Sequence, residues 1–245
     1  MKCIFLAAGY ATRLYPLTLN FPKPLLSVGN STVLDRLIAD LDKAGRVDEY
    51  ITVTNARFAG IFREWAGKHG QKITVLDDGT ESNETRLGAV KDIQFALDET
   101  GIRDDTLVMA GDNALDFSLA GFLDFAANKG TSCVMCHEEN ELKRLRKTAV
   151  ITADEAGLIT SYEEKPEQPK GNLAVPPFYF YKAADIARIR EALGDGCGYD
   201  APGSFAAWLS RKTEMHAYRM PGRRFDIGDI DSYERVKAYF AGKQD

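Results

Sequence analysis

The chain has 245 residues, a formal net charge of −5 and four cysteines. This length accommodates one α/β domain with a sizeable core, and the net charge excludes a global basic field that would attract nucleic acid. No apolar run approaches the roughly 20 residues of a membrane span, and no secretory signal precedes Gly9. We therefore predict a cytoplasmic protein with neither a membrane nor a nucleic acid as partner.

Strand and helix patterns alternate through the first half of the chain. Strands are predicted at four apolar or β-branched runs: residues 3–6, 51–53, 73–76 and 107–109. Helices are predicted where apolar residues recur at i, i+3 and i+4: residues 33–41 behind an N-cap at Asn30-Ser31, residues 58–65 and residues 89–97. This alternation predicts an α/β fold with a doubly wound, mostly parallel sheet, whose functional groups gather at the carboxyl ends of the strands.

The second half of the chain is richer in β-structure. Residues 148–152 and 158–162 are two apolar runs around a turn, and they predict a β-hairpin. Residues 173–181 predict a further strand, which Pro176 and Pro177 should bulge or place at a sheet edge because proline lacks a backbone donor. Helices are predicted at residues 183–193, 204–211 and 231–240.

The loop after the first strand is the most informative segment of the chain. It runs from Ala7 to Pro24 and contains three prolines, Arg13 and Lys23. An exposed backbone can approach a phosphate chain closely, and two fixed cations can neutralise it. The loop therefore predicts nucleotide chemistry at the first crossover of the sheet. A dinucleotide-binding G-x-G-x-x-G is excluded, because no second or third glycine follows Gly9 at that spacing.

This loop resembles the signature of the sugar-phosphate nucleotidyltransferases, roughly GxGTRxxPxTxxxPK. The matching residues are Gly9, Thr12, Arg13, Pro16, Thr18, Pro22 and Lys23, and Ala11 stands at the second glycine. The chain is similar to the glucose-1-phosphate thymidylyltransferases of this family, which implies a Rossmann-like fold. The resemblance also implies that Arg13 and Lys23 are catalytic. It implies a nucleotide contact for Leu6, Ala8, Gly9, Tyr10 and Thr12.

Two aspartates resemble the metal ligands of the family. Asp112 lies in Gly111-Asp112-Asn113, directly after the strand at residues 107–109. Mg²⁺ favours hard oxygen ligands and usually takes one or two carboxylates, although such a triplet is also ordinary turn chemistry. The segment Phe225-Asp226-Ile227-Gly228 resembles a late W-x-D-x-G segment of the family and implies that Asp226 is the second ligand of a Mg²⁺ cofactor. Asp229, which follows, is predicted as the N-cap of the last helix.

Residues that resemble an acceptor site lie in the second half of the chain. Glu163-Glu164-Lys165-Pro166 contains the E-K-P motif of the family. The resemblance implies that Glu164 contacts the hydroxyls of the acceptor, and that Lys165 binds its phosphate and is a third catalytic residue. A fixed ammonium group would reduce the repulsion between two reacting anions. The following strand resembles one that closes the sugar pocket, which adds Asn172 and Val175 to the acceptor contacts. A solvated charged turn is the alternative for this motif.

The segment that would recognise the base is less clear from the sequence. Asn83 and Gly88 fall where relatives have a glycine-rich turn that opens a helix under the base, but Thr85 replaces the leading glycine. Backbone amides at the start of this helix could recognise the base, and Asn83 could bind a pyrimidine edge. Asn83 could equally cap the helix.

Cys133 and Cys136 have the C-x-x-C spacing of a metal or redox site. They lie within an apolar run that resembles a buried strand, and only His137 is near as a further ligand. Core thiols are therefore the favoured interpretation.

Taken together, the motifs predict a single nucleotidyltransferase domain over residues 1–245. Residues 1–137 are expected to bind mainly the nucleotide, and residues 138–245 to form a smaller, β-rich acceptor part. The hypothesis is Mg²⁺-dependent transfer from a nucleoside triphosphate (dTTP, UTP or CTP) to a sugar 1-phosphate, which yields a nucleoside-diphosphate sugar and pyrophosphate. The alternatives are a cytidylyltransferase that acts on phosphocholine or another non-sugar phosphate or phosphonate, and an inactive nucleotide-binding homologue. The family resemblance leaves a homo-oligomer open.

Overall fold

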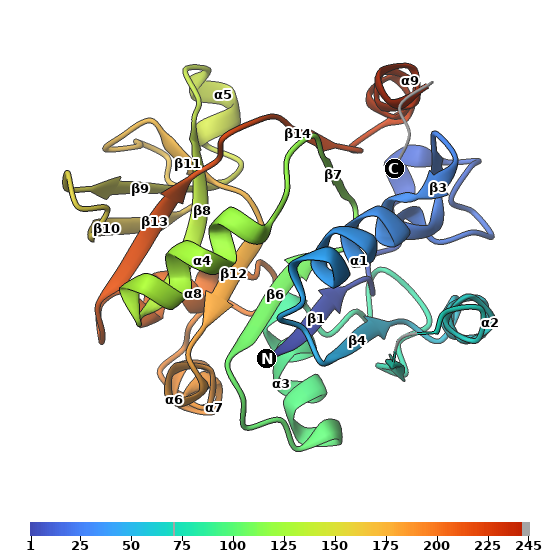
Figure 1. Ribbon diagram of the computed structural model, residues 1–245, viewed down its shortest axis with the longest axis horizontal. Coiled ribbons are helices and arrows are strands. Elements are labelled where there is room, and N and C mark those ends of the chain that lie inside the picture. The colour runs from blue at the N-terminus through green and yellow to red at the C-terminus, as the bar shows by residue number, and fades with distance from the viewer. Residues whose placement is uncertain (71, 242–245) are drawn as a thin grey trace. The chain divides into compact units, whose positions relative to one another are not determined.

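The computed structural model of the chain describes residues 1–70 and 72–241 and divides into two compact units. Among the described residues, the N-terminal unit contains Cys3–Arg86, Ala110–Ala120 and residues 221–241. The central unit contains Met1–Lys2, Leu87–Met109 and Gly121–Met220. Each unit is therefore assembled from segments that are far apart in the sequence (Figure 1).

The N-terminal unit combines three adjacent strands of the main sheet with helices and two small two-stranded sheets. Its strands are β1 (Lys2–Leu6), β2 (Ser27–Val28), β3 (Ser31–Thr32), β4 (Glu49–Thr54), β5 (Ile73–Asp77), β7 (Asn113–Leu115) and β14 (Arg224–Asp226). Its α-helices are α1 (Val33–Ala44), α2 (Ala59–Ala66) and α9 (Ile230–Phe240), and its 3₁₀ helices are η1 (Thr12–Leu14) and η2 (Lys23–Leu25). The strand order is β1-β4-β5, with β4 and β5 parallel from Tyr50↔Ile73 to Thr54↔Asp77.

Helix α1 shows how the local sequence sets an element and its limits. Its apolar residues are spaced for one face, and that face is buried, from Val33 to Leu41. The predicted N-cap at Asn30-Ser31 is wrong, because the N-cap is Thr32, the residue that directly precedes the helix. The Thr32 hydroxyl accepts from the Asp35 N–H at 3.1 Å, and the Asp35 carboxylate accepts from the Thr32 N–H at 3.1 Å, which completes a capping box.

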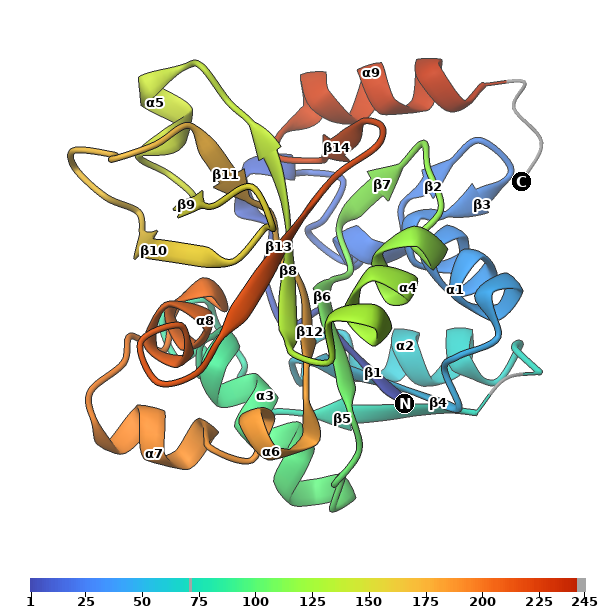
Figure 2. The ribbon, with the colours of Figure 1, turned by 60° about the vertical axis from the view of Figure 1, so that its left-hand side comes forward.

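The central unit contains most of the antiparallel structure. Its strands are β6 (Thr106–Ala110), β8 (Ser132–Glu138), β9 (Ala149–Ala153), β10 (Ile159–Glu164), β11 (Leu173–Val175), β12 (Phe178–Tyr181) and β13 (Met215–Arg219). Its helices are α3 (Ala89–Thr100), α4 (Ala120–Lys129), α5 (Leu142–Leu145), α6 (Ala183–Ile186), α7 (Ile189–Gly194) and α8 (Gly203–Leu209). The strand order is β10-β9-β11-β8-β12-β6, and β13 pairs with β8 in parallel (Figure 2).

The predicted α/β fold class is confirmed, and so is the β-rich second half. The predicted hairpin is the antiparallel pair β9·β10, which turns at Asp154–Gly157. The strand predicted over residues 173–181 is two strands, because Pro176 and Pro177 interrupt it without a backbone donor. Neither part is an edge strand, since β11 lies between β9 and β8, and β12 lies between β8 and β6.

Two further predictions concern the helices and the cysteines. The helix predicted at residues 183–193 is two short helices, α6 and α7, whereas Asp229 caps α9 as predicted, with its carboxylate accepting from the Ser232 N–H at 2.8 Å. Cys133 and Cys136 are buried in β8, and burial raises the pKa of each thiol to about 11.

Within residues 1–70 and 72–241, no helix has the length and apolar character that a membrane span requires.

Candidate functional site

The loop that follows β1 is anchored at its start by hydrogen bonds to neighbouring segments of the N-terminal unit. The Ala7 N–H donates to the Val53 carbonyl and the Asn55 side chain donates to the Ala8 carbonyl, each at 2.9 Å. The Tyr10 hydroxyl donates to the Thr80 carbonyl, also at 2.9 Å. Gly9 lies exposed between these fixed neighbours. These hydrogen bonds hold the buried residues on both sides of Gly9, so Gly9 is the exposed point of this segment.

Ala11 explains why the family signature has a glycine at this position. Its φ of 47° lies in the left-handed region, which favours glycine and costs an alanine about 1–2 kcal/mol. The buried Thr18 hydroxyl donates to the Ala11 carbonyl at 2.8 Å and holds this turn. The turn leads directly into η1, which leaves Thr12 and Arg13 exposed to solvent.

Lys23 begins η2, and its ammonium group contacts both predicted metal ligands. Nζ lies 2.7 Å from Asp112 Oδ2 and 3.8 Å from Asp226 Oδ1, while the whole residue is only 9% exposed. The next residue, Pro24, packs so closely on Gly111 that a β-carbon there would lie 3.2 Å from the proline ring. The glycine before Asp112 thus allows the aspartate to approach η2.

The antiparallel pair β7·β14 brings the two aspartates together. Asp226 lies opposite Asn113, which is the residue after Asp112. The Asp112 side chain is 31% exposed and the Asp226 side chain 55% exposed, so both remain accessible to a ligand. One cation, the Lys23 ammonium, reaches an oxygen of each. Two hard carboxylates that share a cation fit the ligand preference of Mg²⁺, which usually takes one or two carboxylates together with phosphate oxygens.

The predicted acceptor residues lie in the central unit, where three of them come together. Glu164 and Val175 both pair with Ala149, on its two sides. The Lys165 N–H donates to the Thr148 carbonyl at 3.1 Å, and the Thr148 hydroxyl donates to the Val175 carbonyl at 3.1 Å. Lys165 has a φ of 47°, an uncommon backbone conformation for a residue with a side chain, and such residues cluster at functional sites.

Glu164 is held in a partly buried position. Its carboxylate packs against Gly203 at the start of α8, so closely that any side chain at position 203 would overlap it. Burial raises the pKa of Glu164, and the neighbouring charge of Lys165 opposes that rise. Asn172 lies exposed at the other end of β11, about 10 Å along the strand from Val175, and it is not brought together with Glu164.

The segment predicted to recognise the base makes contacts that the sequence did not indicate. The N-cap of α3 is Gly88, and Asn83 lies in a separate turn, so the alternative that Asn83 caps this helix is wrong. The Val90 N–H donates to the Tyr199 carbonyl at 2.9 Å and the Ala89 N–H to the Asp200 carbonyl at 3.3 Å. These two amides are therefore occupied by a loop of the protein itself.

Gly88 is required by this loop for a steric reason. A β-carbon at this position would lie 2.7 Å from the Tyr199 carbonyl oxygen and 2.8 Å from its ring, and the φ of Gly88 is 95°. Tyr199 is half-exposed, and its ring lies beneath the Lys91 ammonium at 4.2 Å. Tyr199 is identified as a neighbour of the start of α3 by this contact alone. No local sequence pattern reveals the contact.

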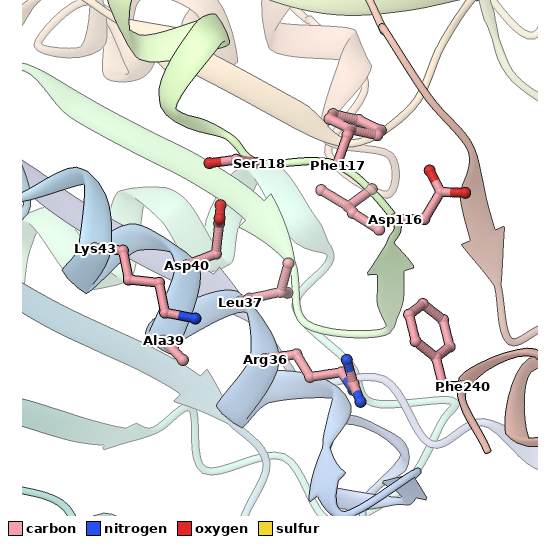
Figure 3. Close-up of a pocket in the computed structure, with 10 residues that line it drawn as sticks. Arg36, Leu37, Ala39, Asp40, Lys43, Asp116, Phe117, Ser118 and Phe240 are labelled. Carbon is pink, nitrogen blue, oxygen red and sulfur yellow. The ribbon is translucent and has the colours of Figure 1, made fainter. Parts of the chain in front are cut away.

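A cavity of about 290 Å³ lies elsewhere in the N-terminal unit, between α1 and the segment after β7 (Figure 3). Its carboxylates accept hydrogen bonds from the protein: Asp40 from the Leu119 N–H at 2.7 Å, and Asp116 from the Arg223 N–H and the Tyr239 hydroxyl, each at 2.6 Å. The predicted site residues are distinct from those that line this cavity. The candidate site is thus defined by its charges and its backbone, and not by this cavity.

Comparison with known proteins places the chain in a family. The model of the nucleotidyl transferase family matches residues 2–242, and the chain belongs to this family. It is 25% identical over 248 residues to a glucose-1-phosphate adenylyltransferase of Bacillus subtilis, covering 94% of this chain and 65% of the relative. It is 24% identical to the UTP–glucose-1-phosphate uridylyltransferase AglF of Haloferax volcanii, covering 93% of this chain and 91% of that protein. The chain thus spans less than two thirds of the first of these relatives.

Solved structures share the fold. A structure of UDP-glucose pyrophosphorylase with UDP-glucose aligns with a TM-score of 0.82 at 21% identity, covering 99% of each chain. A protein of Bacillus anthracis, provisionally named a glucose-1-phosphate thymidylyltransferase, aligns with a TM-score of 0.85 at 22% identity, covering 100% of this chain and 97% of that one. The family and the Rossmann-like architecture inferred from the loop after β1 are therefore confirmed.

Proposed function

We propose that the protein catalyses Mg²⁺-dependent nucleotidyl transfer from a nucleoside triphosphate to a sugar 1-phosphate. The observation that carries this proposal is the contact of Lys23 with Asp112 and Asp226, at 2.7 and 3.8 Å. An ammonium group can bind the polyphosphate, and the two accessible carboxylates beside it can bind the metal ion of that polyphosphate. The names of the relatives, which act on sugar 1-phosphates, support the choice of acceptor.

The reaction requires positioning and charge neutralisation more than proton transfer. An oxygen of the acceptor phosphate forms a bond to the α-phosphorus, and the bond from that phosphorus to the bridging oxygen of pyrophosphate breaks. A phosphate monoester is already largely dianionic near neutral pH, so the nucleophile needs no general base. The rate then depends on holding the reactants in line and on stabilising charge.

Each group of residues has a defined task in this scheme. The exposed Arg13 binds the leaving pyrophosphate, and Lys23 stabilises the region of the α-phosphate. Asp112 and Asp226 would hold Mg²⁺, and the bound ion would supply neutralisation of phosphate charge. In the central unit, Lys165 binds the phosphate of the acceptor and Glu164 its hydroxyls. The nucleotide contacts predicted for Leu6, Ala8, Gly9, Tyr10, Thr12, Asn83 and Gly88 belong to the same proposal.

The proposal is tested by pyrophosphate release with each of five nucleoside triphosphates against a panel of sugar 1-phosphates. Phosphocholine and aminoethylphosphonate complete the acceptor panel, and a chelator-treated control omits the metal. One strong sugar 1-phosphate pair that requires Mg²⁺ would support the proposal. Release only with phosphocholine and CTP would replace it by the cytidylyltransferase alternative. Nucleotide binding without any release would favour an inactive homologue.

A further inference from the structure

Asn113 is a buried polar residue with two short hydrogen bonds in the N-terminal unit. It is 2% exposed, and its Nδ2 donates to Asp112 Oδ1 at 2.6 Å. Its Oδ1 accepts from Arg224 Nη1, also at 2.6 Å. The side-chain amide thus connects a guanidinium group to one of the two carboxylates proposed to hold the metal.

The orientation of this amide follows from its neighbours. A carboxylate offers only acceptors and a guanidinium group only donors. Turning the amide round would set its oxygen against the carboxylate of Asp112 and its NH₂ group against Arg224, which loses both hydrogen bonds. Arg224 and Asp112 therefore both favour the same orientation of the Asn113 amide, and Arg224 anchors its oxygen while the NH₂ group binds Asp112 Oδ1.

These bonds leave the other oxygen of Asp112 for a cation. Oδ1 accepts from Asn113, whereas Oδ2 lies 2.7 Å from the Lys23 ammonium. Arg224 and Asp226 are two residues apart on β14, so their side chains leave the strand on the same face. A single short strand therefore carries one metal aspartate and the residue that orients the other.

We propose that Arg224 is a positioning residue, which acts through Asn113 to hold the Asp112 carboxylate in the orientation that binds a divalent cation. This inference rests on the metal assignment in the proposed function. Groups that hydrogen-bond to a metal ligand orient it and prepare it for the metal, and their loss typically weakens metal binding by about 10- to 100-fold. Arg224 contributes its planar donors here, and a lysine cannot reproduce that geometry.

The test measures Mn²⁺ binding to the full chain without nucleotide, from the electron paramagnetic resonance signal of free Mn²⁺. Arg224→Met removes the charge and the donors, and we expect its Mn²⁺ affinity to fall by about 10- to 100-fold. Arg223→Met is the matched control, because it removes the same charge from the preceding, exposed residue. It should bind Mn²⁺ as the unmodified protein does. Thermal unfolding of each variant verifies that the fold is retained.

Arg224→Lys keeps the positive charge but loses the planar donors, so it separates the orientation of the Asp112 carboxylate from the effect of charge. It is also the test if Arg224→Met does not fold. Its Mn²⁺ affinity should lie clearly below that of the unmodified protein. Equal affinity in Arg224→Met and Arg223→Met, or full affinity in Arg224→Lys, would overturn the inference while the metal assignment stands. If the unmodified protein binds no Mn²⁺ with or without nucleoside triphosphate, the metal assignment itself fails, and this inference fails with it.

Discussion

The acidic groups of the N-terminal unit and of the central unit are stabilised in different ways. Asp112 and Asp226 share the Lys23 ammonium, and Asp112 also accepts a hydrogen bond from Asn113. Glu164 in the central unit is influenced mainly by burial, which raises its pKa, and Lys165 opposes this only by its charge. Nearby, the buried Tyr181 hydroxyl has no hydrogen-bond partner among the described residues.

This difference suggests how each unit is prepared for its ligand. The N-terminal unit holds its carboxylates in a charge-balanced network before any ligand arrives, so binding exchanges one cation for another. The central unit keeps polar groups in a partly desolvated environment, where a ligand that supplies hydrogen bonds gains the most. Substitutions of Asp112, Lys23 and Glu164 test this contrast, and a substitution of Gly88 tests the packing of the central unit itself.

Asp112→Asn should remove the metal site and almost all activity while the fold persists. Loss of a metal ion that neutralises phosphate charge removes several kcal/mol from the transition state, which corresponds to about a thousandfold in rate. Pyrophosphate release and the thermal unfolding temperature are measured together. Asp231→Asn on α9 is the control in the same unit. Near-normal turnover in Asp112→Asn would reject the metal assignment.

Lys23→Gln should lower the rate of pyrophosphate release and raise the affinity for the metal ion. Pyrophosphate release should fall about a hundredfold, because one fixed donor to the reacting phosphate is lost. The affinity of the free protein for Mn²⁺ should rise, because the ammonium no longer neutralises Asp112 and Asp226. Lys237→Gln, which removes an exposed charge on α9, is the control. An unchanged or lower Mn²⁺ affinity in Lys23→Gln would show that Lys23 does not compete for the carboxylates.

Gly88→Ala should destabilise the protein, because its β-carbon meets Tyr199 and its φ is 95°. Strain of this kind costs about 1–3 kcal/mol, and each kcal/mol lowers the unfolding temperature of a domain of this size by about 2–4 °C. The control is Gly60→Ala in α2, where nothing lies within 4 Å of the new β-carbon. It should raise stability by up to about 1 kcal/mol. Equal unfolding temperatures in the two variants would show that a β-carbon at position 88 does not clash with Tyr199.

Glu164→Gln should stabilise the protein in a pH-dependent way. Since the folded state raises the pKa of Glu164 from 4.5, ionising the carboxyl group costs stability as the pH rises through the folded pKa. The variant should therefore unfold at a higher temperature than the unmodified protein at pH 7–8. The gap should close below about pH 4.5. Glu167→Gln, which removes an exposed carboxylate, is the control, and a gap that is independent of pH would contradict the assignment.

The sequence predicts correctly those features that depend on residues close together in the chain, and it fails where residues far apart in the chain decide the structure. The hairpin at β9 and β10, the cap of α9 by Asp229 and the apolar face of α1 depend on residues a few positions apart, and they were predicted. The N-cap of α1 lies at Thr32 and not at Asn30-Ser31, because Thr32 completes the capping box with Asp35. Likewise, the sequence shows that Pro176 and Pro177 disfavour a regular strand, but only the sheet order shows that the strands on either side of them, β11 and β12, are not edge strands.

By itself the sequence determined the family, the α/β class and the composition of the loop after β1, because these depend on residue types at fixed spacings. The tertiary structure alone decided which charges meet. Lys23 and Asp112 are 89 positions apart and Arg224 and Asn113 are 111 apart, so only the packing of η2, β7 and β14 brings them within hydrogen-bond distance. Tyr199 beside Gly88 is a further case of this kind. Local sequence sets backbone conformation and hydrogen-bonding capacity, whereas contacts between distant residues follow from how the elements pack.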